Sequence, residues 1–152
     1  MNTKLLIAPF VLAMAVSTAR AQNGPSIPPE VETVISGGDW ITKDSVEGHY
    51  RIVIETEGLE HLISRLRVEW IADPSKSDTP AKIVAVQEVP IGAGGVYLTA
   101  PTIGLEVGRW ILTVDATNTH CDPMPTERWR IALNLPAQAK VLDSTVIKRG
   151  CE

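Results

Sequence analysis

Residues 47–73 alternate between apolar and polar side chains in two runs, and this alternation is the strongest constraint on the fold. The stretch reads EGHYRIVIETEGLEHLISRLRVEWIAD, with a glycine-bearing turn at residues 57–60 between the runs. Because successive side chains of a strand point to opposite faces, the pattern predicts a β-hairpin with one buried and one solvated face. The predicted buried side chains are Tyr50, Ile52, Ile54, Leu62, Leu66, Val68 and Trp70.

Shorter runs of the same kind predict strands along most of the remaining chain. The clearest are 109–117 and 128–134, in which Trp110 and Trp129 fall on the apolar side. No stretch shows the period of an amphipathic helix. About seven to nine strands separated by turns predict an all-β, two-layer antiparallel β-sandwich of immunoglobulin-like architecture. A small closed barrel is the alternative. The other predicted strands are 31–36, 39–42, 81–89, 95–100 and 139–147.

The first 21 residues have the pattern of a signal peptide. A short start with Lys4 precedes the apolar run LLIAPFVLAMAV, and the segment ends in a small-x-small cleavage motif, Ala-Arg-Ala. The apolar run is shorter than the roughly 20 residues that a membrane-spanning helix needs. We therefore expect the mature chain to begin at Gln22 and to be periplasmic or secreted. Residues 22–30 are predicted to be a flexible lead, and residues 31–152 a single domain.

The charge balance excludes two classes of partner. The chain has 14 basic and 18 acidic residues. Removal of the signal peptide takes away Lys4 and Arg20, which leaves 12 basic residues against the same 18 acidic ones. Nucleic acids and anionic lipids both require a basic surface. We therefore expect neither nucleic acid nor anionic lipid as the main partner. No stretch after the signal peptide is long and apolar enough for membrane insertion, and the expected partner is another envelope protein.

Cys121 and Cys151 are the two cysteines, and export favours their pairing as a disulfide. The bridge would fasten the end of the chain to the loop before residues 128–134. His120 and Met124 beside Cys121 raise the alternative of a metal site, but a disulfide sulfur is not a thiolate ligand. We therefore predict no metal and no cofactor. Immunoglobulin domains place their cysteines on facing strands, so the similarity to that class ends at the architecture.

No group of residues has the spacing of a catalytic site. Ser45 stands near Asp44 and His49, but no G-x-S-x-G elbow accompanies it. The acidic residues at 57–60 are typical of an exposed turn, although a carboxylate pair could hydrolyse glycosides. The sequence therefore favours a protein that is not an enzyme. A hydrolase whose residues are assembled only by the fold is the third hypothesis for function.

The outward side of the predicted hairpin is a candidate protein interface. It carries Arg51, Arg65 and Arg67 together with Val53 and Ile63, a mixture that is common at interfaces. The same mixture is typical of a solvated sheet face with cross-strand ion pairs. Because the three arginines point away from the predicted core, their replacement is expected to spare stability.

Trp40 and Tyr97 are candidate contacts for a sugar or another small ligand, since aromatic rings are frequent at recognition sites. For Trp40, core packing is the first interpretation and ligand binding the second. The leading hypothesis is a non-enzymatic β-sandwich protein that acts as a protein-binding accessory, adaptor or inhibitor in the cell envelope. The second is a ligand-binding module that uses Trp40 and Tyr97. No oligomeric state follows from the sequence.

We predict that the mature protein contains no free thiol. Thiol titration after denaturation without reductant should detect none, because both cysteines are expected to be bridged. Cys121→Ser should lower the melting temperature and leave a β-type circular dichroism spectrum, since the chain-entropy model assigns such a bridge about 3–4 kcal/mol. Two titratable thiols in freshly purified protein would contradict the pairing.

Overall fold

The computed structural model describes residues 31–59, 61–74, 80–92 and 95–150. These residues form eight β-strands and no helix. The predicted signal peptide, the predicted lead and Cys151 lie outside the described residues. The strands are β1 (Val31–Ile41), β2 (Glu47–Glu57), β3 (Ile63–Ala72), β4 (Lys82–Val89), β5 (Tyr97–Glu106), β6 (Arg109–Thr117), β7 (Thr126–Leu133) and β8 (Ala139–Lys148).

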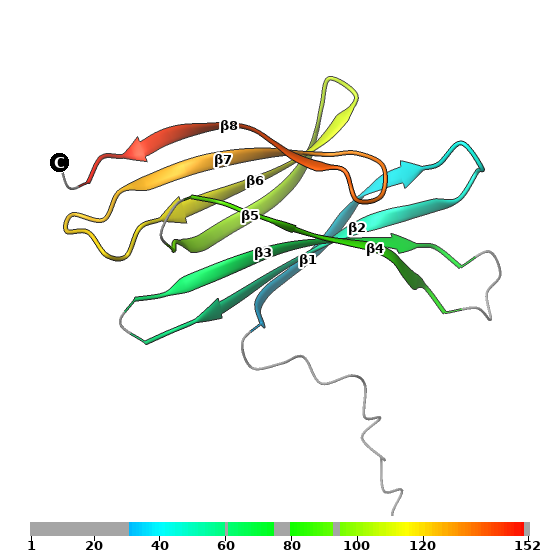
Figure 1. The fold of residues 1–152 in the computed structure, drawn as a ribbon. Coiled ribbons are helices and arrows are strands. Elements are labelled where there is room, and N and C mark those ends of the chain that lie inside the picture. The colour runs from blue at the N-terminus through cyan, green and yellow to red at the C-terminus, as the bar shows by residue number, and fades with distance from the viewer. Residues whose placement is uncertain (1–30, 60, 75–79, 93–94, 151–152) are drawn as a thin grey trace, which may run out of the picture.

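The strands form two antiparallel sheets that pack face to face (Figure 1). The first sheet has the order β1-β2-β3-β4 and the second the order β5-β6-β7-β8, so each is a meander in chain order. This confirms the predicted all-β class, the number of strands and the sandwich of two layers. The strand order is not the Greek-key order of immunoglobulin domains, which interleaves distant strands in each sheet.

Most predicted strands are confirmed, and two differ in extent. Residues 31–36 and 39–42 were predicted as two strands, but they belong mainly to the single strand β1, which continues through a bulge at Gly38. Strand β5 continues past Pro101 to Glu106, where the sequence predicts an end at residue 100. A proline can lie in a strand at the edge of a sheet, and β5 is such a strand.

Irregular pairing is confined to the outer strands of both sheets. The central pairs β2–β3 and β6–β7 run without any shift in register. Each outer strand carries at least one extra residue relative to its neighbour. Bulges bend a strand and interrupt the row of free peptide groups that another strand would need. All four edges are therefore poor templates for pairing with an additional strand. The extra residues include Gly38 on β1, Val84 on β4, Ala100 on β5, and Leu142 and Ile147 on β8.

The centre of the core is an aromatic pair from the first sheet that is bonded to the second. Tyr50 and Trp70 are directly opposite each other on β2 and β3, and their rings meet edge to face at 6.2 Å. Both are almost completely buried, so each polar atom requires a partner. The Tyr50 hydroxyl donates to the carbonyl oxygen of Asn134 at 3.0 Å, and Trp70 Nε1 donates to the same oxygen at 2.9 Å.

Two further sets of hydrogen bonds join the sheets at their sides. The side-chain amide of Gln87 on β4 pairs in both directions with the backbone of Ala139 on β8, at 2.9 Å each. On the opposite side, the backbone N–H of Ser64 donates to the carbonyl of Val96 at 2.8 Å. The Ser64 hydroxyl accepts from the N–H of Leu98 at 3.0 Å. Polar bonds therefore accompany apolar packing between the layers.

We expect alkaline pH to destabilise the protein through Tyr50. Burial, reinforced by the Asp39 carboxylate, raises the pKa of Tyr50 from 10.0 to about 12. A raised folded-state pKa favours the protonated form, so this stabilisation is complete below pH 10 and is lost as pH rises towards 12. Tyr50→Phe should cost about 1 kcal/mol at neutral pH, because the bond to Asn134 is lost.

The measurement is the free energy of unfolding in urea as a function of pH. Wild type should lose stability steeply between pH 10 and 12, and Tyr50→Phe should lose less over the same interval. Tyr97→Phe is the comparison variant: the hydrogen bond to Glu32 raises the pKa of Tyr97 as well, but Tyr97 is more exposed and lies outside the core cluster, so this variant should differ less from wild type. Parallel pH profiles for wild type and Tyr50→Phe would contradict this role of the buried hydroxyl.

Candidate binding surfaces

The arginines of the first sheet form an ion-pair ladder with glutamates of the same sheet. We use the term arginine face for the outer surface of β2 and β3 that carries Arg51, Arg65 and Arg67. Arg51 contacts Glu69 at 2.5 Å, directly across the strands. The predicted cross-strand ion pairs are therefore present, and each of the three arginines has a glutamate of the same sheet as its partner. The other pairs are Arg67–Glu55 at 2.7 Å, Arg67–Glu69 at 3.0 Å and Arg65–Glu57 at 3.1 Å.

Glu69 is the anchor of this ladder. It is only 4% exposed although it lies on the outer face, and its two oxygens accept hydrogen bonds from Arg51 and Arg67. Burial acts to lower the pKa of Arg67, but the hydrogen bonds and charges of Glu55 and Glu69 outweigh it and raise that pKa. The Arg51 and Arg67 head groups are thus held in fixed positions by a carboxylate that water barely reaches.

The aliphatic side chains of the arginine face behave differently from one another. Val53 is only 4% exposed between its neighbours, whereas Ile63 is 38% exposed. Val53 is therefore covered by its own chain, and the accessible aliphatic surface lies around it. On the same side of the sheet, Val34 on β1 and Ile83, Val84 and Val86 on β4 are 43–52% exposed.

The outer side of the second sheet has a different composition along its central strands. Thr113 and Asp115 on β6 lie opposite Arg130 and Arg128 on β7. Arg128 and Asp115 are joined by two hydrogen bonds at 2.8 and 3.0 Å. Along these central strands the surface is polar and ion-paired, whereas the edge strand β8 carries exposed aliphatic side chains, Leu142, Val146 and Ile147, at 41–56%.

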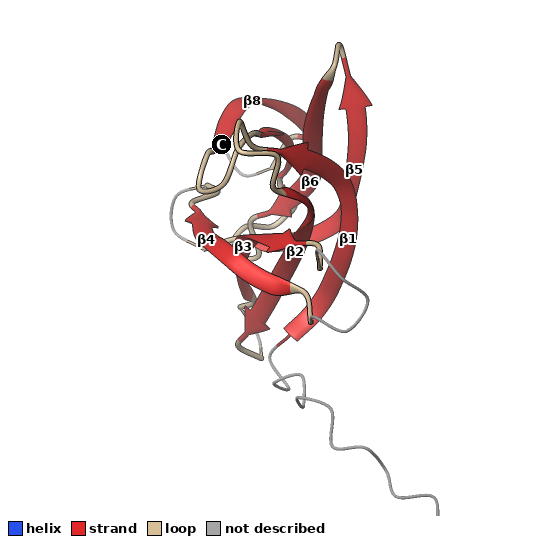
Figure 2. Cartoon of the chain, turned by 90° about the vertical axis from the view of Figure 1, so that its right-hand side faces the viewer, coloured by secondary structure: helices blue, strands red, loops and turns tan. Residues whose placement is uncertain are grey.

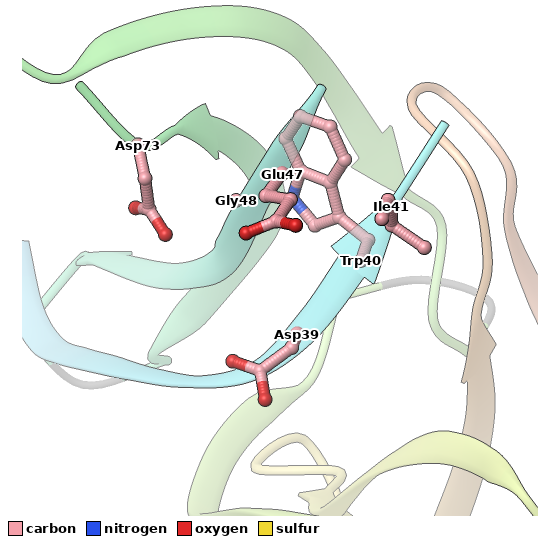
Figure 3. A pocket seen from close by; sticks show the side chains of 6 residues that line it. All are labelled: Asp39, Trp40, Ile41, Glu47, Gly48 and Asp73. Carbon is pink, nitrogen blue, oxygen red and sulfur yellow. The ribbon is translucent and has the colours of Figure 1, made fainter. Parts of the chain in front are cut away.

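Trp40 belongs to the core, as the first of its two sequence interpretations has it. Its side chain is 5% exposed, and Nε1 donates to the carbonyl of His49 at 3.0 Å. The indole lies directly on Gly48, where a Cβ atom would be 2.4 Å from Trp40 Cζ2. Trp40 also borders a shallow depression of about 280 Å³ (Figure 3). The carboxylates around it are those of Asp39, Glu47 and Asp73.

Trp40 and Tyr97 do not come together in the structure. The Tyr97 hydroxyl donates to Glu32 Oε1 at 2.5 Å, near the start of β1. Glu32 and Trp40 lie near opposite ends of this strand, roughly 26 Å apart along an extended chain. Hydrogen bonds from Thr56 and Tyr97 lower the pKa of Glu32. The hydroxyl of Tyr97 is therefore already engaged, and the two aromatic residues do not share one pocket.

The histidines do not assemble the catalytic or metal sites that the sequence brought into question. His49 Nδ1 lies 2.8 Å from Asp73 Oδ1, so its partner is not the nearby Ser45–Asp44 segment. His61 and His120 stack with their ring centroids 4.2 Å apart. Among the described residues, no group of three or more histidines, cysteines or acidic residues is placed to hold a metal ion.

Cys121 is not a free cysteine, but its predicted partner Cys151 lies outside the described residues. The predicted pairing therefore stays a prediction. Two surface features were missed by sequence reasoning, the exposed aliphatics of β4 and the tip of the β5–β6 hairpin. The latter had a signal in the dipeptide Val107-Gly108, which replaces the Asn-Gly that two-residue hairpin turns prefer.

Comparison with known proteins found no matching family model, no similar curated protein and no similar solved structure. The described residues include no helix that is long and apolar enough to cross a membrane. The surfaces of the two-sheet fold are therefore the basis for a functional hypothesis.

We predict that two arginines of the same face differ in their effect on stability. Arg65 has a side chain that is 61% exposed and pairs with an exposed glutamate, so Arg65→Ala should change the free energy of unfolding by about 0.5 kcal/mol or less. Arg67→Ala removes one of the two partners of buried Glu69 and should cost about 1–3 kcal/mol. The expectation that all three arginines can be replaced without loss of stability is thus restricted to Arg65.

Urea unfolding of the two single variants measures this difference. Glu69→Gln in the Arg67→Ala background should recover part of the loss, because it removes a buried charge that only Arg51 then compensates. Equal midpoints for Arg65→Ala and Arg67→Ala would show that Glu69 does not depend on its arginine partners.

Proposed function

We propose that this is a non-enzymatic exported protein that binds another protein of the cell envelope through the outer side of its first sheet. The observation that carries the proposal is the pair of arginines that the buried carboxylate of Glu69 fixes beside exposed aliphatic side chains on one face. The second sheet also carries exposed aliphatic side chains, on β8, but among its described residues it has no acidic side chain as buried as Glu69 to fix its arginines. Arginines mixed with aliphatic residues are typical of the contact surfaces of protein complexes.

The ion-pair ladder supports this role because it reduces the cost of association. Ordering a long side chain at an interface costs conformational entropy. The head groups of Arg51 and Arg67 are already held by Glu69, and Arg51 still has a side chain that is 38% exposed. A partner would thus meet a surface whose polar groups are positioned in advance.

The bulged edges indicate the mode of binding. Addition of a partner strand requires a regular row of free peptide groups, and the edge strand β4 has an extra residue at Val84. We therefore propose recognition by side chains across the face. The ligand-binding alternative has less support, because Trp40 is covered by its own chain and Tyr97 lies at the other end of β1.

Partner recovery from the native envelope tests the proposal. The tagged double variant Ile83→Ser/Val86→Ser should melt close to wild type and recover its partner at least about tenfold less well, since about 1.4 kcal/mol of lost contact is enough for that. The matched control is Val146→Ser/Ile147→Ser, which makes the same change at similarly exposed positions on the outer strand β8.

The control variant should recover partners as wild type does. Unchanged recovery by the β4 variant together with loss in the β8 variant would place the contact surface on the second sheet. Addition of Arg65→Ala to the β4 variant should deepen the defect without further loss of stability, because its ion pair is exposed.

A further inference from the structure

The tip of the β5–β6 hairpin carries an unfavourable residue in an unfavourable conformation. Glu106 pairs with Arg109, which leaves Val107 and Gly108 as a two-residue turn. Both have positive φ, +46° for Val107 and +71° for Gly108. Glycine tolerates this region, whereas a β-branched side chain there is a genuine outlier. Val107 is also completely exposed to solvent, so no packing within the described chain compensates for it.

The surface next to this tip is apolar as well. The hairpin projects beyond the other strands of the sandwich (Figure 2). Leu105 is 60% exposed and lies opposite Trp110 in the hairpin. Beside the tip there is a groove of about 300 Å³ that Gly108 itself helps to line, and Trp110, Ile41 and Leu135 are among its apolar lining residues. A projecting apolar tip and a groove with both apolar and polar lining residues thus occur side by side at one end of the molecule.

The groove also carries one charge of each sign. Asp39 and Arg109 both line it, and both are exposed. Neither forms an ion pair with any described residue. By contrast, the other arginines of the central strands, on β2, β3 and β7, are all paired with acidic residues. The free acid and the free base are therefore available to an external partner with the same two charges.

We propose that a second copy of this chain occupies the groove, in a two-fold symmetric dimer in which each Val107 inserts into the groove of the other copy. A two-fold interface requires a surface that is complementary to itself. This end of the molecule can meet the requirement through two kinds of contact, because Val107 of each copy can lie against the apolar lining residues of the other, and Asp39 of each copy can pair with Arg109 of the other. The strained valine then acquires a buried environment that the single chain does not provide.

Sedimentation equilibrium of the exported, processed protein over a range of concentrations tests the proposal. Wild type should associate to a dimer. Val107→Asn restores the preferred Asn-Gly turn, so it should raise the melting temperature, and it removes the apolar tip, so it should weaken the dimer about thirtyfold or more. Leu105→Ser is the second variant and should weaken the dimer without touching the turn.

Charge reversal provides the sharper control. Asp39→Arg gives a copy with two bases at the groove, and Arg109→Asp gives a copy with two acids. Each variant alone should dimerise at least about tenfold more weakly than wild type, because like charges face each other in both symmetric contacts. An equimolar mixture of the two should form a heterodimer, in which both contacts again join opposite charges.

The possible results of these experiments either support or overturn the proposed dimer. A monomer at every concentration would overturn the proposal, and so would a dimer that Val107→Asn leaves unchanged or a mixture that shows no heterodimer. Loss in the single variants with recovery in the mixture would establish it. Because the arginine face lies elsewhere on the molecule, none of these results depends on the envelope partner proposed above.

Discussion

One carbonyl oxygen, that of Asn134, is the hydrogen-bonded link between the two sheets at the centre of the core. It accepts hydrogen bonds from Tyr50 and Trp70, the two largest side chains at the centre of the core. A carbonyl has two lone pairs, so both donors can be satisfied at once. If the second sheet moved relative to the first, two polar groups would be buried without partners, at a cost of about 1–3 kcal/mol each. Apolar packing alone is not directional in this way.

The same oxygen connects the core to the surface of the molecule. Asn134 directly follows β7 and lines the end groove together with Tyr50 and Trp110. Gly38 makes this arrangement possible, because a Cβ atom there would be 2.9 Å from both the Tyr50 and the Trp110 ring. The bulge on β1 therefore has a packing reason. It lets two aromatic rings approach the backbone at the end of the sandwich where the groove opens.

The sequence predicted the strand faces, which depend on local alternation of apolar and polar residues. It missed the features in which this alternation is interrupted or does not determine burial. The faces of β2, β3 and β6 were predicted correctly, because no extra residue disturbs the order of side chains within these strands. The second half of β5 was missed because Pro101 marks a break in any local pattern. Glu69 gave no signal of burial either, since alternation assigned it to the outer face and said nothing of the flanking arginines that cover it.

The candidate sites also differ in whether they depend on local alternation or on the arrangement of strands that are distant in sequence. The arginine face was predicted because it follows from alternation, and its cross-strand ion pairs are present. Whether Trp40 and Tyr97 share one site could not be judged from the sequence, because this depends on which ends of the strands lie next to each other in the fold. The tip at Val107 was visible as a departure from the usual turn dipeptide, but its meaning required the exposure of the side chain and the groove beside it.

The two proposed contacts use different parts of the molecule, and together they would strengthen each other. A dimer formed through the β5–β6 tips leaves the outer side of the first sheet open on both copies, because the aliphatic rim on β4 is not part of the groove. Two equivalent faces on one rigid dimer turn a second binding event into an intramolecular one. Even a weak contact across each face could then give durable attachment to an envelope partner that is itself symmetric or repeated. In this arrangement the dimer contact made by Val107 would aid partner binding indirectly, because the dimer would hold two arginine faces at a fixed separation.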